Sequence, residues 1–491
     1  MPTRFAGFVA AICLLIGLPA MLATGAELVP DRRIIHALNR LAFGPTLEDF
    51  RHVKTVGIER YIAEQLDPDA IPEPAELRAR LASLDTLRLN PVQLRQIYGP
   101  LRTLRGFKPS PELERAQRER VQVILRDASE ARVLRAVLSP RQLYEVMVDF
   151  WFNHFNIFSG KGLDDVWIGN YEERAIRPYA LSRFRDLLFA TTKHPAMLVY
   201  LDNTLSTAPG SRGARGNQKG LNENFARELM ELHTLGVDGG YTQEDVITLA
   251  RILTGWGVNP PDARVYPEYA AVFEGARHDY SAKVFLGRQL QSRGKAEGEE
   301  ALEILARSPA TAHHISFELA QYFVEDEPPS SLIDKLTERF LQTDGDIREV
   351  LKALFASPEF WNSYSRKYKT PYQFLISAVR AAGVTVTNVR PLLTAMDQFG
   401  MPLYGCLTPD GYRNTEDAWL SPDATARRIG FATALGKGAL PITPMAQPVD
   451  AIRLEAIFAE TISDNTRDAI AGSPQGLRAA MMLGSPDFMR R

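Results

Sequence analysis

Hydrophobic residues recur every three or four positions along most of this chain, which is the spacing of one face of an α-helix. Residues 121–137 and 332–341 keep this spacing over their whole length. Helices with one apolar stripe bury that stripe against each other. The pattern therefore predicts a mainly α protein, a large multi-helix globular domain.

Serine followed by proline marks several of the expected helix starts. A serine at the N-cap accepts a hydrogen bond from the first turn, and the fixed φ of proline suits the first helical position. Such pairs occur at Ser110–Pro111, Ser139–Pro140, Ser357–Pro358 and Ser485–Pro486. Each pair is predicted to begin a helix.

One region departs from the helical pattern. Residues 269–274 and 283–290 are typical of short strands, and the residues between them include a glycine. This arrangement predicts a small β-hairpin insertion near residues 265–292.

The first 26 residues predict a secretory signal peptide. Arg4 supplies a positive charge, residues 8–18 are apolar, and small residues at 24–26 suit cleavage. A membrane anchor is the alternative, but Gly17 and Pro19 interrupt a run that is already short for a bilayer. The mature protein is therefore expected to be periplasmic or secreted, with no transmembrane segment.

The remaining chain is predicted to form one main body with a C-terminal extension. Residues 27–440 make up the main helical domain with the β insertion. Prolines concentrate in residues 441–448, which is typical of a linker. Residues 441–491 are expected to supply this linker and C-terminal helices that pack on the main domain.

Composition narrows the class of protein. Of the 491 residues, 45% are hydrophobic and 24% are charged, as is usual for a soluble globular protein. The formal net charge of -2 argues against a nucleic-acid binder, which would be basic. Of the two cysteines, Cys13 lies in the predicted signal peptide, so Cys406 has no partner for an intrachain disulfide after cleavage.

Polar residues form a stripe on an otherwise aromatic helix predicted over residues 142–158. Its members are Gln142, Glu145, Asp149, Asn153 and Asn156. A buried polar group without a partner costs about 1–3 kcal/mol, so these side chains need partners. The stripe is either a satisfied core network or solvent face, or the wall of a site. His154 lies off the stripe and alone is typical of a core histidine.

A second polar segment covers residues 222–236. Glu223 with Arg227, and Arg227 with Glu231, have the i,i+4 spacing of helical ion pairs. Glu228 and Glu231 are like charges on one face and repel each other unless a cation lies between them. Carboxylates near an imidazole can bind a metal ion, although His233 is five residues from Glu228. The segment is either a salt-bridge lattice or a site.

Two smaller histidine motifs give weaker signals. His278 precedes Asp279 in the predicted hairpin loop, where the pair forms either a plain turn or a carboxylate-oriented imidazole. His313 and His314 point about 100° apart on a helix, so they are not expected to share a ligand.

Several standard motifs are missing from the sequence. It contains no Gly-x-Ser-x-Gly, P-loop, Rossmann, Cys-x-x-Cys or c-type haem signature. These absences remove many common enzyme classes.

The motifs, taken in order, resemble the bacterial domain-of-unknown-function 1800 family. The resemblance rests on HALNRLAFGPT at 36–46, DFWFNHFN at 149–156, HPAMLVYLDN at 194–203 and NENFARELMELHTLGVDGG at 222–240. It continues with LTGW at 253–256, His278 with Asp279, residues 286–287, PDGY at 409–412 and Trp419. The resemblance implies a large, exported, mainly helical bacterial protein, and it implies no reaction. Members are often described beside a second exported family that resembles sulfatases and phosphatases, which suggests a co-exported envelope partner of that kind.

Two functions follow from these observations. The first is a metal-dependent envelope enzyme with a pocket of carboxylate, carboxamide and imidazole groups, since imidazole titrates near neutral pH. Its expected catalytic residues are His233, His154 and Glu228; its substrate-binding residues are Asn153, Asn156, Asn224, Arg227 and Trp256; its ligands for a divalent metal ion are Asp149, Glu223 and Glu231. The alternative is a non-catalytic envelope protein that binds a protein partner or a surface polymer.

Overall fold

The computed structural model describes residues 30–100, 110–214, 220–258 and 271–491. The predicted signal peptide of residues 1–26 lies outside these ranges. Within them the chain forms 24 α-helices and four short strands, so the predicted mainly α class is confirmed.

The helices of the first third are α1 (Pro30–Leu41), α2 (Leu47–Val56), α3 (Ile58–Leu66), α4 (Ala75–Ala82), α5 (Pro91–Tyr98), α6 (Pro111–Leu138) and α7 (Gln142–His154). The middle third contains α8 (Asp164–Tyr171), α9 (Phe184–Thr192), α10 (Pro195–Tyr200), α11 (Asn224–Glu231), α12 (Gln243–Ile252), α13 (Lys295–Ala306) and α14 (Pro309–Phe323). The last third contains α15 (Ser330–Gln342), α16 (Ile347–Phe355), α17 (Pro358–Asn362), α18 (Pro371–Ala382), α19 (Arg390–Gln398), α20 (Glu416–Trp419), α21 (Pro422–Gly436), α22 (Ala451–Phe458), α23 (Asp464–Ala471) and α24 (Arg478–Leu483).

Two of the four Ser–Pro pairs begin helices as predicted. The hydroxyl of Ser110 accepts a hydrogen bond from the Leu113 amide at 3.3 Å at the start of α6. The hydroxyl of Ser357 accepts one from the Phe360 amide at 3.2 Å at the start of α17. Both serines satisfy an amide that the first turn leaves without a helical acceptor.

The other two pairs do not begin helices, and those predictions were wrong. The hydroxyl of Ser139 donates to Glu73 at 2.8 Å and accepts from the Arg141 amide, and α7 begins only at Gln142. The hydroxyl of Ser485 accepts from the Phe488 amide at 3.1 Å, but this bond closes a turn after α24.

The predicted small β-hairpin insertion is present, within residues 283–290. Strand β3 (Lys283–Phe285) pairs with β4 (Arg288–Leu290), and β2 (Ala271–Phe273) pairs with β1 (Trp256–Val258), both antiparallel. The first of the two predicted strand segments thus pairs with β1, which the sequence did not mark as a strand. Leu286 and Gly287 have positive φ angles of 49° and 73°, which turn residues 283–290 back on themselves.

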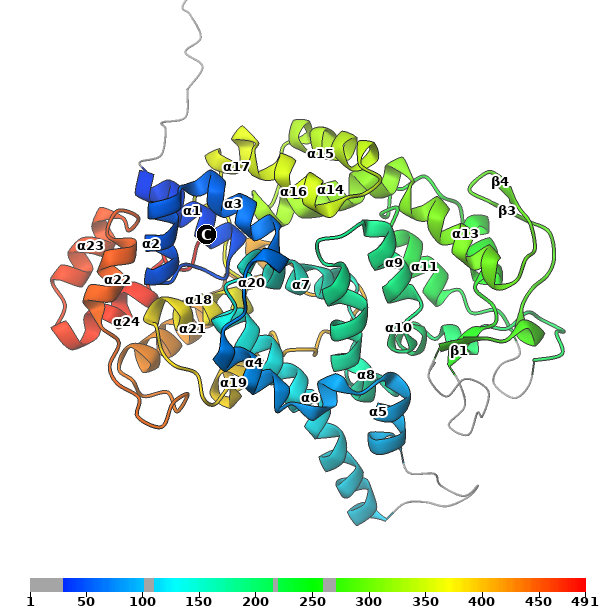
Figure 1. The fold of residues 1–491 in the computed structure, drawn as a ribbon, viewed down its shortest axis with the longest axis horizontal. Coiled ribbons are helices and arrows are strands. Elements are labelled where there is room, and N and C mark those ends of the chain that lie inside the picture. The colour runs from blue at the N-terminus through cyan, green and yellow to red at the C-terminus, as the bar shows by residue number, and fades with distance from the viewer. Residues whose placement is uncertain (1–29, 101–109, 215–219, 259–270) are drawn as a thin grey trace, which may run out of the picture.

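Helix α7 lies near the middle of the molecule, in contact with α1, α3 and α6 (Figure 1). The side chains of Leu143, Met147 and Trp151 are fully buried on it. An aromatic helix of this kind is buried on most faces, so its polar residues must find partners inside the protein.

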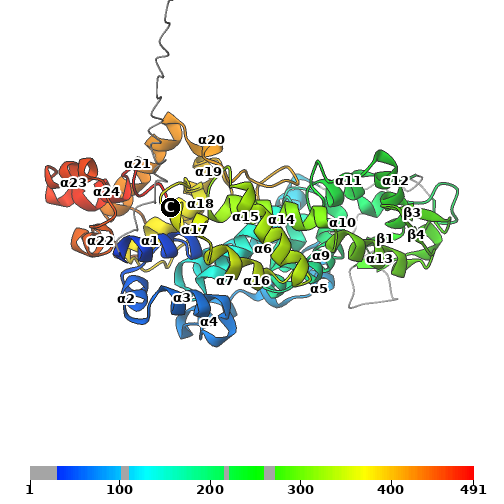
Figure 2. The same cartoon turned by 90° about the horizontal axis from the view of Figure 1, so that it is seen from above.

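The C-terminal helices pack beside the N-terminal ones. Helix α22 contacts α2 and α18, and α24 contacts α21. In both views the chain end lies next to α1, at the opposite end of the long axis from β3 and β4 (Figures 1 and 2). No helix in the described ranges combines the length and the apolar sequence that crossing a bilayer requires.

Candidate functional site

A cavity of about 300 Å³ opens between α7, the end of α11, α14, the start of α18 and residues 401–415, here called the 401–415 loop. This volume lies at the lower end of the range for small-molecule sites. Carboxylates, carboxamides and aromatic rings share the lining. The helices that form it are distant in sequence, so only the tertiary fold creates the cavity.

Arg132 of α6 forms one end of the cavity with Asp149 of α7. Its guanidinium donates to Asp149 at 2.5 Å and to Glu172 at 3.2 Å, and it lies over the Phe152 ring at 4.8 Å. Burial alone would lower the pKa of Arg132, but Glu172 and Asp149 raise it well above its ordinary value. Burial raises the pKa of Asp149 despite the neighbouring Arg132.

The ion pairs continue away from the cavity into the core. Arg177 contacts Glu172 at 3.5 Å and Glu145 at 2.5 Å. Acidic and basic side chains thus alternate from Asp149 to Glu145, and all are buried or nearly so. Two members of the polar stripe on α7, Glu145 and Asp149, therefore belong to a satisfied charge network. Asp149 also lines the cavity.

His154 is held by two hydrogen-bond acceptors. Its Nδ1 lies 2.6 Å from the carboxylate of Glu318, and its Nε2 lies 3.2 Å from the carbonyl oxygen of His233. The His154 side chain is 2% exposed and that of Glu318 is 28% exposed. Glu318 is therefore the member of this pair that a ligand in the cavity can reach.

Glu318 lies among three histidines. Burial raises the pKa of Glu318, but the neighbouring His154, which also forms a hydrogen bond with it, and His314 outweigh burial and bring this pKa below its ordinary value. His314 contacts Glu318 at 3.5 Å, and its Nε2 donates to the carbonyl of Leu232 at 3.1 Å. Glu318 is therefore an ionised carboxylate at neutral pH.

His233 lies behind this group and does not line the cavity. Its side chain is buried, and its Nε2 has no hydrogen-bond partner among the described residues. Burial, reinforced by the nearby His154, lowers the pKa of His233 from 6.5 to about 3. The ring is therefore neutral in the folded protein at neutral pH.

We expect His233 to make the protein less stable in mild acid. Between pH 6.5 and 3 the unfolded chain protonates this histidine and the folded protein does not, so stability falls as the pH falls. At pH 5 the neutral, buried His233 lowers the free energy of unfolding by about 2 kcal/mol. Between pH 7 and pH 5, the free energy of unfolding should therefore fall by about 2 kcal/mol less in the His233→Leu variant than in wild type. Urea unfolding at the two pH values measures this change.

The neighbouring exposed residue gives the control for this measurement. The His313→Leu variant should keep the wild-type pH dependence, because His313 is exposed. Equal pH dependence in wild type and His233→Leu would contradict the neutral, buried state of His233.

Asn153 and Asn156 hold the 401–415 loop. The Asn153 amide donates to the Tyr412 carbonyl at 2.9 Å and accepts from the Tyr412 amide at 2.8 Å. Asn156 donates to the Thr408 carbonyl at 2.8 Å. Gly411 has a φ of 71°, and a Cβ there would come within 2.3 Å of the Asn153 carbonyl oxygen. The two predicted substrate-binding amides thus fix the cavity wall and also line it.

Glu231 brings the end of α11 into the cavity, whereas Glu228 does not line it. Of the two predicted ion pairs in this segment, Glu223 with Arg227 forms, at 3.1 Å. Glu231 has no cationic partner in the described parts of the chain. Burial raises the pKa of Glu228, and the charges of Glu231 and Asp410 add to this effect.

The other predicted substrate-binding residues lie outside the cavity lining. Asn224 donates to the Leu201 carbonyl at 3.3 Å, and Arg227 also binds Gln243 at 3.0 Å. Trp256 is buried in β1. The structure thus brings His154, Asn153, Asn156, Asp149 and Glu231 to one cavity and leaves these three apart.

The predicted metal ligands do not meet. Asp149 is bonded to Arg132, and Glu223 is bonded to Arg227 outside the cavity. Glu231 lines the cavity, but in the ranges described no group of three or more His, Cys, Asp or Glu side chains is placed to hold an ion. These donors do not fit a resident metal ion.

Sequence reasoning missed the residues that face the cavity from α14 and the 401–415 loop. His314 and Glu318 are spaced i,i+4 on α14, and this spacing signals a shared helix face. Asp410 and Arg413 belong to the loop, where no periodicity marks a site. The pair on α14 could therefore have been found, and the loop residues could not.

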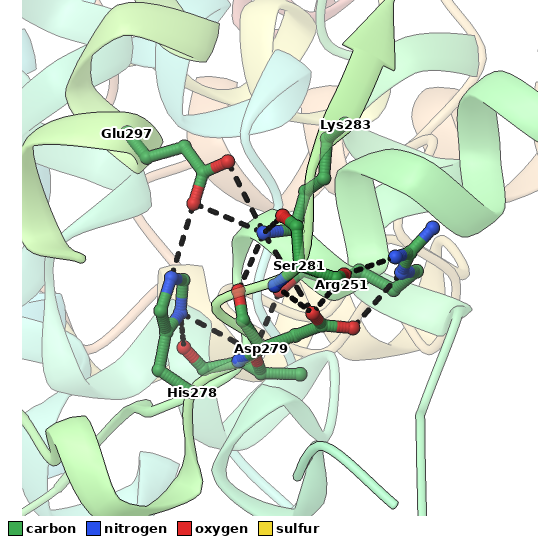
Figure 3. A network of polar contacts seen from close by, with 7 residues as sticks. Arg251, His278, Asp279, Ser281, Lys283 and Glu297 are labelled. Atoms are coloured by element: carbon green, nitrogen blue, oxygen red, sulfur yellow. Dashed lines mark hydrogen bonds and ion pairs between the residues drawn. The ribbon is translucent and has the colours of Figure 1, made fainter. Parts of the chain in front are cut away.

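A second polar network lies around the strands (Figure 3). Glu297 of α13 accepts from His278 at 3.0 Å and contacts Lys283 at 3.1 Å, and all three side chains are fully buried. Arg251 of α12 donates to Asp279 at 2.9 Å. His278 thus pairs with Glu297 and not with Asp279, and the network joins α12, α13 and β3.

The sequence profile of a family described as "Protein of unknown function (DUF1800)" matches residues 36–490. The chain belongs to the DUF1800 family. This match confirms the resemblance seen in the sequence. No curated protein and no solved structure matches this DUF1800 protein. Its function must therefore be argued from the cavity.

Proposed function

We propose that this DUF1800 protein is an exported enzyme of the bacterial envelope, with its active site in the cavity between α7, α11, α14 and the 401–415 loop. Glu318 is the observation that carries the proposal. It lines the cavity, and its two carboxylate oxygens contact His154 and His314. Polar groups held this firmly beside a pocket are typical of catalytic sites.

Glu318 would act as an ionised carboxylate at neutral pH. The imidazoles around it lower its pKa, so it does not supply a proton at neutral pH. A fixed negative charge stabilises positive charge that develops on a bound substrate, because the group is already oriented before the reaction. His154 and His314 act through Glu318 as positioning residues.

Export is proposed from the sequence of residues 1–26. The resemblance adds a co-exported partner related to sulfatases and phosphatases. Coexpression and affinity capture of such a pair would test the partner.

Elemental analysis checks the conclusion that the predicted donors do not fit a resident metal ion. Protein purified without chelator should contain no stoichiometric metal. A stoichiometric metal that is lost in Glu231→Gln would overturn this conclusion.

The enzyme proposal predicts turnover that depends on an open cavity. Val237 lies on the rim and is 67% exposed, so tryptophan fits there without disturbing the core. Wild type and Val237→Trp should be incubated with envelope polymer fragments, and products followed by mass spectrometry. We expect wild type to form at least one product. The rate of product formation should be lower by about tenfold or more in Val237→Trp.

An exposed valine far from the cavity provides the matched control. Val284 of β3 is 53% exposed, and Val284→Trp should keep wild-type turnover. Absence of any product with all three proteins, alongside retained binding of a polymer, would favour the non-catalytic binding function. Equal turnover in Val237→Trp and wild type would move the active site away from this cavity.

A further inference from the structure

The cavity carries more negative charge than its own cations neutralise. Glu231 and Asp410 line it, and neither has an ion-pair partner in the described ranges. Arg132 is bonded to two carboxylates, as described above. Arg413 is bonded to Asp417 at 2.9 Å, and its side chain is 66% exposed. Both arginines of the cavity lining are therefore already paired with other carboxylates, and neither neutralises Glu231 or Asp410.

The pKa of Glu228 reports the same imbalance from outside the cavity. Burial raises this pKa, and Glu231 and Asp410 raise it further by repulsion, while Arg227 opposes them. Neighbouring like charges disfavour the ionised form of a carboxyl group, and a positive charge placed among them favours it.

A tyrosine hydroxyl in the lining points to a polar ligand. The Tyr372 side chain is 2% exposed and lines the cavity, and its hydroxyl forms no hydrogen bond with another described residue and is open to the cavity. A polar group of a ligand in the cavity can therefore form a hydrogen bond with this hydroxyl.

The aromatic lining suits a cation as well. Phe150, Tyr322 and Tyr412 contribute aromatic rings to the lining of the cavity. The face of an aromatic ring attracts a cation, and more strongly where water is excluded. Carboxylates and rings together favour a positively charged ligand over a neutral or anionic one.

We propose that the cavity binds a ligand that carries a primary ammonium group, with Glu231 and Asp410 as its acceptors. A primary ammonium has three donors and no acceptor, which matches a lining rich in carboxylate oxygens. Envelope polymers present this group on amino sugars and on basic peptide side chains. The inference rests on the proposed function only in using the same cavity.

Paired probes that differ only in charge test the inference. A glucosamine trimer and its N-acetylated form, and a trilysine peptide and its fully N-acetylated form, should be titrated by calorimetry at low ionic strength. We expect at least one amine probe to bind. Its acetylated form should bind at least about tenfold more weakly, because acetylation removes the charge-assisted hydrogen bonds. Comparison of the glucosamine pair with the trilysine pair shows whether the ligand is an amino sugar or a basic peptide.

Variants of the two carboxylates complete the test. Glu231→Gln and Asp410→Asn should each weaken the amine probe about tenfold. Glu59→Gln and Asp468→Asn, exposed acids on α3 and α23, are matched controls and should not change binding. Equal affinity for amine and acetylated probes, or no binding of either amine, would overturn the inference.

The outcomes separate this inference from the proposed function. Turnover of a neutral substrate that depends on the open cavity, without amine binding, would retain the enzyme and overturn the ammonium ligand. Amine binding without turnover of any probe would retain the ligand and overturn the enzyme.

Discussion

Glu318→Gln is expected to lower turnover by about 100-fold to 1000-fold, the loss seen when one preorganised electrostatic group is removed. Glutamine keeps the shape and can still accept a hydrogen bond from His154, but it carries no charge. The expected result is a lower kcat for the substrate found by the screen, with little change in thermal stability. Steady-state kinetics at pH 7 measure the effect.

A glutamate outside the cavity controls for this substitution. Glu338 lies exposed on α15, where Glu338→Gln should leave kcat unchanged. A folded Glu318→Gln protein with wild-type kcat would remove Glu318 from the active site. A parallel loss of kcat and of thermal stability would show instead that Glu318 serves mainly to hold His154.

Arg132→Met is expected to destabilise the folded protein by about 3–5 kcal/mol, the usual cost of removing one partner from a buried ion pair. Methionine fills much of the volume and leaves Asp149 with no cation at hydrogen-bond distance. Glu172 keeps Arg177 at 3.5 Å and the Tyr404 hydroxyl at 2.8 Å, so Asp149 bears most of the cost. Urea unfolding at pH 7 measures the change.

An exposed arginine gives the comparison. Arg115 contacts Glu119 at 2.9 Å on the solvent face of α6, and both side chains are exposed. Arg115→Met should cost less than about 1 kcal/mol, because water already screens that pair. A loss below 1 kcal/mol in Arg132→Met would mean that Asp149 finds another partner or becomes protonated.

Local sequence signals predicted local structure well where the determining contacts are local. The capping of α6 by Ser110 needs only residues within one turn, and so does the start of α17 at Ser357. At Ser139 a distant carboxylate, Glu73, takes the hydroxyl, and the prediction failed there. The pairing of β2 with β1 was not predicted for the same reason, because the fold brings these two distant segments together.

The candidate site was predictable in part. Periodicity on α7 identified Asp149, Asn153 and Asn156, because one helix face is fixed by the 3.6-residue repeat. It could not show that Asn153 and Asn156 hold the 401–415 loop or that Asp149 binds Arg132, because those partners lie on other segments.

By itself the sequence determined the mainly α class and the family, and it placed one wall of the cavity on α7. Those features depend on helical periodicity and on motifs that can be read within short segments. Only the tertiary structure decided that Glu318 faces the cavity, that His233 lies behind it, and that Glu231 and Asp410 have no ion-pair partner among the described residues. These properties depend on burial and on contacts between distant segments, which a linear pattern does not contain.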